Sequence, residues 1–408
     1  MNGVCQKFLT ALICLAASAQ VTPDQKPPAA QPATSRATPI KLDQLPIAYV
    51  NQGQQNLPIR AFFEPAITDE GIQGARLGLT DNNTTGRFTR QGYALKEVIL
   101  PASGDAPAAF KQLLAEGYRH ILVDLPDELI VILSRLPEAR HVLLYDVGNS
   151  ADRLRGEACA ANVLHLLPSR AMRADALAQY LAKKRWQKLF LVTGPTEQDG
   201  LYASAIKRAA GRFGLKIIAE KDWPRSFGER RTQESEIPVF TQGVEYDVLI
   251  VADEAGSFGD TLAYRTWLPR PVAGTQGLTP VAWHRTHEQW GALQLQNRFR
   301  AQAGRWMGEK DYVAWLAVRA IGEAATRSGS VEFDKVKSFM LGDEFTLAAY
   351  KGAPLSFRRW DGQLRQPLLL AADRSLVAVA PIAGFLHPRN ELDTLGYDQP
   401  ETPCRMNQ

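Results

Sequence analysis

The chain has 408 residues, of which 45% are hydrophobic and 22% are charged, an ordinary globular composition over a length too great for one compact core. Its 47 Lys and Arg residues nearly balance 43 Asp and Glu residues. No window collects basic residues with interleaved aromatics, so the sequence argues against a nucleic-acid partner.

The first 19 residues have the pattern of a secretory signal peptide. Lys7 precedes an apolar stretch at 8–17, and Ala17-Ser18-Ala19 is a small-x-small cleavage site. The stretch is shorter than the roughly 20 residues that cross a bilayer, and no later stretch reaches that length. We therefore expect export to the periplasm, with no membrane span after cleavage. A lipoprotein is the alternative, but Cys14 follows Ile13 rather than a small residue.

Residues 20–44 are predicted to form a tether, because the segment is rich in Pro, Ala, Gln and Thr and has few large apolar side chains. Strand-length apolar runs then recur. Several are continuous rather than alternating, as in strands buried on both faces. The runs are 47–50, 94–100, 120–124, 141–146, 188–193, 215–220 and 247–252.

Helical patterns lie between these runs. An apolar stripe at 174–181 opens after Ser169, a residue suited to cap a helix, and another at 203–213 ends before Gly214. A third helix is expected around 313–324, within a longer helical stretch at 287–327, and a strand-rich end at 345–381 follows. The βαβα alternation predicts an α/β fold with parallel, doubly wound sheets in two Rossmann-like lobes.

Catalytic motifs are missing from the sequence. There is no Gly-x-Ser-x-Gly elbow, no Walker A sequence and no Gly-x-Gly-x-x-Gly fingerprint, so we expect neither an enzyme nor a bound cofactor. His284 and His287 form one close histidine pair, beside Glu288. Without a larger constellation of cysteines or carboxylates, we expect no metal site there.

Four polar or glycine-bearing loops follow apolar strands, where doubly wound sheets bind small molecules. Ordinary turn chemistry explains any one of these loops, but four from two lobes favour a shared ligand site. They comprise 62–65, 146–150, 193–200 and 252–256. Their candidate ligand-binding residues are Phe63, Glu64, Asn149, Ser150, Thr193, Asp199, Asp253 and Glu254.

Trp283 is a further candidate, because it lies where the strands and helices of the second lobe end and the long helical stretch begins. It can serve as an aromatic platform on the wall of the site, or it can pack inside a hinge. The sequence leaves both interpretations open.

Two cysteines, Cys159 and Cys404, remain after signal cleavage. In an oxidising compartment they predict one disulfide that ties the C-terminal tail to the middle of the chain. Two free thiols are the alternative.

The order of features resembles that of type I periplasmic binding proteins, the branched-chain amino-acid-binding relatives that serve ABC transporters. The residues that carry this likeness are Gly71-Ile72-Gln73-Gly74-Ala75-Arg76, Leu167-Pro168-Ser169, and the run at 188–192 with Asp199-Gly200. Two further segments, at 82–88 and 164–172, look like a subgroup associated with PQQ-dependent alcohol dehydrogenase systems. The resemblance extends over residues 45–381.

This resemblance implies two lobes joined by a three-crossing hinge. The first would comprise 45–167 and about 284–345, and the second 168–283 and about 346–385, with 386–408 as a tail. It also implies an ABC permease and ATPase as partners. The Ser-Pro-x-Ala-Thr loop of amino-acid binders is replaced by Gly148-Asn149-Ser150-Ala151-Asp152, so an amino-acid ligand is not expected.

The sequence thus predicts a periplasmic solute-binding protein that captures a small polar molecule between its lobes. The alternative is a non-transporting accessory or sensor subunit of a periplasmic dehydrogenase system with the same fold.

Overall fold

The computed structural model describes residues 42–53, 67–224 and 233–406. The predicted signal peptide, nearly all of the predicted tether, and Phe63 and Glu64 lie outside these residues.

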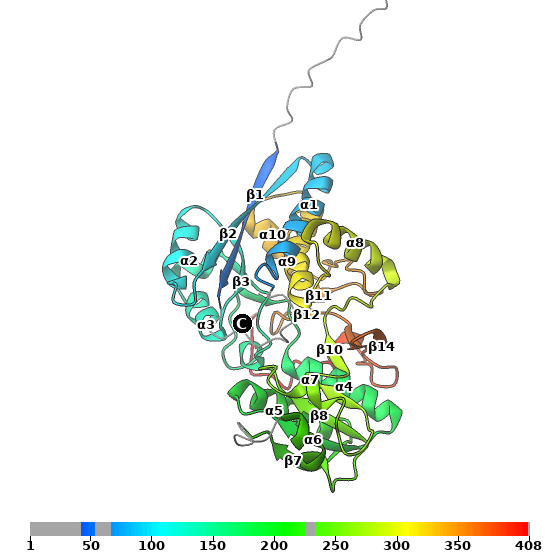
Figure 1. The fold of residues 1–408 in the computed structure, drawn as a ribbon. Coiled ribbons are helices and arrows are strands. Elements are labelled where there is room, and N and C mark those ends of the chain that lie inside the picture. Colours follow the sequence, from blue (N-terminus) through cyan, green and yellow to red (C-terminus); the bar gives the residue numbers. More distant parts are fainter. Residues whose placement is uncertain (1–41, 54–66, 225–232, 407–408) are drawn as a thin grey trace, which may run out of the picture. The chain divides into compact units, whose positions relative to one another are not determined.

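A five-stranded parallel sheet forms the centre of the first lobe within the described residues, in the order β2-β1-β3-β4-β5. It appears with α1 in the upper part of Figure 1. Along β1, Ile47 and Tyr49 pack into one core cluster, whereas Ala48 and Val50 pack into another on the opposite face. This period of two explains the continuous apolar runs, since both faces are covered. The strands are β1 (Asp43–Gln52), β2 (Gln91–Leu100), β3 (His120–Asp124), β4 (Leu143–Asp146) and β5 (Val163–His165).

Helices cover both faces of this sheet, which makes it doubly wound. The side chains of α1 and α9 share one core cluster with the sheet, while α2 and α3 contribute to the other. Gly74 permits the close approach of α1 to α9, because a Cβ there would lie 1.8 Å from the Asp311 carbonyl oxygen. The helices are α1 (Ile72–Thr89), α2 (Ala106–Ala115), α3 (Asp127–Ser134), α8 (Ala292–Ala303), α9 (Glu309–Ser328) and α10 (Phe333–Met340).

The second lobe has a parallel sheet of four described strands, in the order β7-β6-β8-β9. Ser169 caps its first helix by accepting a hydrogen bond from the Met172 backbone N–H, as the sequence predicted. The strands are β6 (Lys188–Thr193), β7 (Lys216–Asp222), β8 (Val248–Ala252) and β9 (Val272–Gly274). The helices are α4 (Arg170–Lys184), α5 (Glu197–Arg212), α6 (Gln233–Thr241) and α7 (Gly259–Leu262).

The strands near the C-terminus are antiparallel, which differs from the expectation that the sheets are parallel throughout. β13 (Leu368–Ala372) pairs with β10 (Thr279–Val281) and β14 (Ser375–Ala380), and β11 (Ser356–Phe357) pairs with β12 (Leu364–Arg365). The turn between β13 and β14 spans two residues, and so short a connection allows only antiparallel pairing. The helical stretch predicted at 287–327 is also divided, with a break between α8 and α9 at Gly304, where φ is 71°.

The C-terminal segment attaches to both lobes. Gly396 donates its backbone N–H to Asp175 on α4 of the second lobe, at 2.8 Å. Further along, Thr402 donates its hydroxyl to the Arg155 carbonyl oxygen of the first lobe, at 2.7 Å. A disulfide then joins Cys404 to Cys159, whose Cα atoms lie 5.8 Å apart. The predicted pairing of the two cysteines is therefore present, and the tail is a bonded element of the fold.

Candidate ligand-binding site

The order of the strands in each parallel sheet indicates where the candidate site lies. In each parallel sheet the order reverses once, between β1 and β3 in the first lobe and between β6 and β8 in the second. Ligands of doubly wound sheets bind at such reversals, outside the carboxyl ends of the strands. The site therefore has two halves, one after β1 and β3 and the other after β6 and β8.

In the second lobe, Asp199 holds two strand-end loops together. Its carboxylate accepts hydrogen bonds from the Thr196 backbone N–H at 3.0 Å and from the Glu254 backbone N–H at 2.7 Å. Asp199 lies in the first turn of α5, which begins at Glu197, so the predicted loop at 193–200 is shorter than expected. Both oxygens of this fully buried carboxylate serve the protein's own backbone.

Asp253 organises the loop that follows β8. One of its oxygens accepts from the Ser257 backbone and hydroxyl, and the other from the Phe258 and Gly259 backbone N–H groups, at 2.7–3.0 Å. The side chain is buried. Like Asp199, it is engaged in holding a loop, and neither carboxylate is free to meet a ligand cation.

Arg170, at the first position of α4, brings three of the four predicted loops together. Its backbone N–H donates to the Ser150 carbonyl oxygen at 3.0 Å. Its guanidinium makes a bidentate ion pair with Glu254, at 2.8 and 2.6 Å, and donates to the Gln198 side chain. The fourth predicted loop, at 62–65, lies outside the described residues.

A second arginine of the same helix bridges the lobes. Arg173 donates to the Pro280 carbonyl oxygen and forms an ion pair with Glu309, the first residue of α9, with both contacts at 2.8 Å. Glu309 also accepts from the Ala282 backbone N–H. Since α4 belongs to the second lobe and α9 packs on α1 of the first, this ion pair crosses between the lobes.

In the first lobe, Asp124 occupies the point where the strand order reverses. It lies at the end of β3, accepts from the Asn51 side chain of β1 at 2.9 Å, and pairs with Lys310 of α9 at 3.1 Å. Burial by itself lowers the pKa of Lys310, but Asp124 and the neighbouring Glu70 outweigh it and raise that pKa, so the lysine is charged.

Tyr49 of β1 lies in the same group of side chains. Burial, followed by the negative charges of Asp124 and Asp311, raises the pKa of its phenol well above the usual value. The side chain of Asn51 lies next to the buried hydroxyl but does not reach it with good hydrogen-bond geometry. An unpaired buried hydroxyl costs free energy, and a ligand or a water at this strand end would supply the missing partner.

The remaining predicted residues fall into two groups. Asn149 donates its side-chain amide to the Leu125 carbonyl oxygen, while Ser150 and Thr193 are partly exposed at the ends of β4 and β6. Trp283 is only 2% exposed and stacks on Tyr312, with ring centroids 4.3 Å apart. The structure thus favours the hinge-packing interpretation of Trp283.

Sequence reasoning missed the charged residues that join the loops, above all Arg170 and Arg173. The first turn of α4 contains no acidic residue. Two arginines there are opposed by the helix dipole, which favours negative charge at an N-terminus. Arginines at this unfavourable position could have been recognised in the sequence as candidate site residues, because another interaction must hold them there.

The segment at 82–88, one of the two that resemble the subgroup associated with PQQ-dependent alcohol dehydrogenase systems, has a packing role in the structure. In α1, Asn82 donates to the Val318 carbonyl oxygen of α9 at 2.7 Å, and Asn83 makes two hydrogen bonds with the Tyr93 backbone. The segment at 164–172, in contrast, contains Arg170 and therefore contributes to the candidate site.

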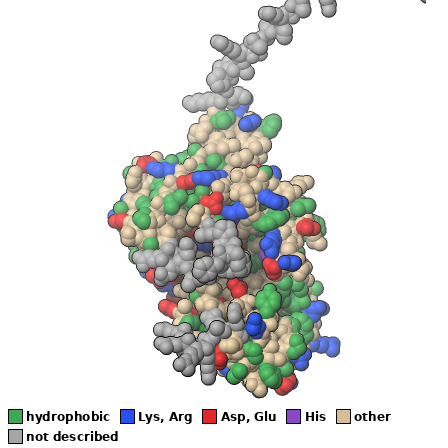
Figure 2. Space-filling view, in the orientation of Figure 1, with side chains coloured by type: hydrophobic (Ala, Val, Ile, Leu, Met, Phe, Trp, Pro, Cys, Tyr) green, Lys and Arg blue, Asp and Glu red, His purple; other side chains and the backbone are tan. Residues whose placement is uncertain are grey.

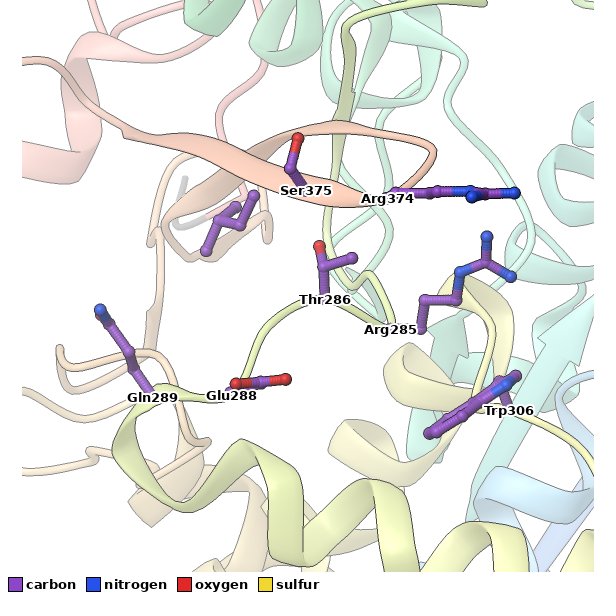
Figure 3. A pocket seen from close by; sticks show the side chains of 8 residues that line it. Arg285, Thr286, Glu288, Gln289, Trp306, Arg374 and Ser375 are labelled. Atoms are coloured by element: carbon purple, nitrogen blue, oxygen red, sulfur yellow. The ribbon is translucent and has the colours of Figure 1, made fainter.

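Two surface hollows lie at other places. The first, of about 640 Å³, lies between 285–289 and the turn that joins β13 to β14. Figure 3 shows Arg285, Arg374 and Trp306 on one side of it. The second, of about 580 Å³, lies beside the C-terminal segment. In Figure 2, cationic and anionic side chains are interspersed over the visible face.

Among the described residues, no cluster of His, Cys, Asp or Glu could hold a metal ion. No helix in this part of the chain has the length and apolar character that a membrane span requires.

Solved structures with the same fold are numerous. A branched-chain amino-acid ABC transporter ligand-binding protein from Burkholderia xenovorans has a TM-score of 0.68 at 15% identity, over 89% of this chain and 100% of that one. A periplasmic binding protein from Burkholderia mallei has a TM-score of 0.64 at 14% identity, over 90% and 100% of the two chains. The fold is that of the type I periplasmic binding proteins.

A third structure with this periplasmic binding protein fold is a solute-binding protein of an ABC transporter from R. palustris, solved with benzoate. Its TM-score is 0.60 at 12% identity, over 88% of this chain and 99% of that one. These structural neighbours are substrate-binding proteins rather than enzymes. No protein-family model and no curated protein matches the chain.

Proposed function

We propose that this chain is the periplasmic solute-binding subunit of an ABC transporter and captures a small polar ligand between its lobes. The observation that carries the proposal is the position of Arg170, which joins the Ser150, Gln198 and Glu254 loops at strand ends of both lobes. A group that contacts several loops at once transmits ligand binding into relative movement of those loops. The N-terminal signal pattern accounts for export, and a permease and an ATPase would be the partners.

The charges of the site favour a ligand that carries little net charge. Its three cations, Arg170, Arg173 and Lys310, are each paired with a carboxylate. Asp199 and Asp253 are occupied by backbone N–H groups, so neither is available for the ammonium of an amino acid. We infer a non-amino-acid ligand connected with PQQ-dependent alcohol oxidation, on the resemblance of residues 82–88 and 164–172 to that subgroup.

The proposed hinge divides the chain into discontinuous lobes. The chain passes from the first core cluster to the second near residue 168, returns near 282 and passes again near 366. Leu347, Leu355 and Leu364 pack in the first cluster, so we place the third crossing about 20 residues later than the boundary of 346 inferred from the resemblance.

A thermal-shift screen of the full chain tests the proposal. The compounds are PQQ, short alcohols, aldehydes, carboxylates and amino acids. A true ligand at 100 times its Kd stabilises the folded state by about 2.7 kcal/mol, which raises the unfolding midpoint. Arg170→Gln should abolish the shift, while Arg374→Gln, at an exposed arginine of the β13–β14 turn, should retain it. Small-angle scattering at saturation should then show compaction, and an unchanged profile counts against lobe closure.

A second candidate is a non-transporting accessory or sensor subunit of a periplasmic dehydrogenase system. One observation favours it: the C-terminal segment is bonded to both lobes and connects them in addition to the crossings. A subunit that only contacts a partner needs no wide opening of its lobes. Ligand-induced stabilisation without any compaction in scattering is the result that this candidate predicts.

A further inference from the structure

The hollow beside the C-terminal segment is built from three separate parts of the chain. These are the turn after α10, the β11–β12 hairpin and the tail itself. Its volume of about 580 Å³ falls in the range of roughly 300–1,000 Å³ that is typical of small-molecule sites. The residues that matter for its chemistry are Phe357, Arg359, Trp360, Arg365, Arg405 and Met406.

Positive charge dominates the lining of this pocket. It contains three arginines and one carboxylate, that of Asp343. Asp343 pairs with Arg359 at 2.7 Å, but that carboxylate is 87% exposed, so the ion pair neutralises little. Arg365 pairs with Asp393, an acid that Arg358 shares.

Arg405 has no carboxylate partner among the described residues. One of its nitrogens, Nη1, donates to the Thr402 and Cys404 carbonyl oxygens, which fixes the side chain against the tail. A guanidinium has five N–H donors, so the others remain for an anion, and its planar fork matches a carboxylate.

Trp360 supplies a second unsatisfied donor in the pocket lining. Its indole N–H is buried and has no hydrogen-bond partner among the described residues. The ring is held by two guanidiniums, those of Arg358 and Arg365, at 5.3 and 5.2 Å from its centroid. A buried donor without a partner is costly, and an acceptor atom of a ligand would satisfy it once binding in the pocket moves the side chains that cover the indole N–H.

Apolar surface adjoins these donors. Phe357 and Met406 both line the pocket, and both belong to or pack against the first core cluster. Guanidinium and indole donors beside an apolar wall are complementary to a molecule with an acidic group at one end and an apolar body at the other. We propose that this pocket is a second ligand site, separate from the site between the lobes, and that it binds a small organic carboxylate.

The disulfide completes this second site. Cys404 immediately precedes Arg405 and Met406, and the Met406 backbone N–H donates to the Trp360 carbonyl oxygen at 3.2 Å. Breaking the Cys159–Cys404 bond would release the tail that contributes two lining residues. Ligand binding in this pocket therefore depends on the oxidised state of the two cysteines.

Fluorine NMR of 4-fluorobenzoate with the full, oxidised chain tests the proposal, with 4-fluorobenzamide as the neutral probe. The carboxylate should bind and the amide should not.

Arg405→Gln should weaken binding about tenfold or more, since a charge-assisted hydrogen bond to a carboxylate is lost. Arg405→Lys should give a smaller loss, and Trp360→Phe, which removes only the indole donor, a loss of several-fold. Cys404→Ser should also weaken binding.

Two control variants locate the site. Arg374→Gln removes an exposed arginine elsewhere, and Arg170→Gln alters the site between the lobes, so both should leave the affinity for 4-fluorobenzoate within about twofold. Circular dichroism verifies that each variant is folded. The proposal is overturned if folded Arg405→Gln and Trp360→Phe bind the probe as the parent does, if Arg170→Gln alone abolishes binding, or if no binding is detected. Loss of binding in Arg170→Gln alone would assign the probe to the site between the lobes and so support the proposed function, whereas unchanged binding in Arg405→Gln and Trp360→Phe overturns only the second site.

Discussion

The two lobes are held together in different ways on the strand-end side and on the tail side. At the strand ends, the contacts between lobes include the Arg173–Glu309 ion pair and hydrogen bonds from the Arg170 and Ala171 backbone N–H groups to Ser150 and Asp152. On the tail side, a disulfide joins Cys404 to Cys159, and the buried Arg358 pairs with Asp393 at 2.9 Å.

This difference indicates which side can move. Ion pairs and single hydrogen bonds can exchange with water or a ligand at low cost, whereas a covalent bond cannot. Closure around a ligand would thus be a rotation in which the strand ends approach or separate while the tail side stays fixed. The predictions below test the two sides in turn.

The largest effect is expected from removing the disulfide. The bond closes a loop of 245 residues, and chain entropy alone assigns such a loop about 5 kcal/mol. Cys159→Ser with Cys404→Ser should lower the free energy of unfolding by about 2–5 kcal/mol, measured in urea. The fully reduced parent chain is the matched control and should behave alike. A loss below about 1 kcal/mol would show that the tail side is not fixed by this bond.

Next in size is the loss of Asp393, which pairs with both Arg358 and Arg365. Asp393→Asn keeps the shape but leaves the buried Arg358 with a weaker counter-charge, and should cost about 3 kcal/mol in urea unfolding. Asp373→Asn, at an acid that is 71% exposed and pairs with Arg285, is the control and should change stability by less than about 1 kcal/mol. Equal effects of the two substitutions would contradict a buried, fixed tail side.

A smaller effect should come from Lys351, which lies at the crossings between the two sides. Burial lowers its pKa from 10.5 to about 7. Between these values the unfolded chain binds more protons than the folded one, so the free energy of unfolding should rise with pH, by about 2 kcal/mol from about pH 7 to pH 9. Lys351→Met should lose this rise. If the free energy of unfolding depends on pH in the same way in both proteins, the Lys351 side chain is hydrated in the folded state and the crossings are accessible to water.

The smallest change in stability belongs to the strand-end side. Arg173→Gln with Glu309→Gln removes both members of this largely buried ion pair, so no buried charge is left without a partner, and the double substitution should cost about 1 kcal/mol or less. Small-angle scattering without ligand should nevertheless detect altered lobe separation, because the Glu309 side chain no longer bridges to α4. If stability falls by about 3 kcal/mol or more, this side is fixed as well and the contrast fails.

Most of the fold was predictable from the sequence. The runs at 120–124 and 188–193 coincide with β3 and β6, and Ser169 caps α4 as expected. These elements depend on local apolar patterns and helix-capping residues. A strand-rich end at 345–381 was predicted and contains β13 and β14, but the antiparallel pairing of β13 with β10 was not, because residues about 90 positions apart leave no local pattern of pairing.

Less of the site was predictable. Three of the four predicted loops follow strands and the fourth, at 62–65, lies outside the described residues, but the acidic residues Asp199 and Asp253 turned out to bind backbone N–H groups. Sequence spacing cannot show whether a carboxylate after a strand faces a ligand or its own loop, since both uses favour the same residues in the same place. Arg170 and Glu254, 84 positions apart, meet only through the tertiary fold.

The Cys159–Cys404 bond also makes a covalent ring that contains every residue of the second parallel sheet. A protease that cuts any loop inside this ring leaves two fragments that stay joined. Such a nicked protein would migrate as one species under non-reducing electrophoresis and as two after reduction. In a compartment exposed to extracellular proteases, the ring would keep a cleaved second lobe attached to its partner, so a single cut need not separate the halves of the molecule.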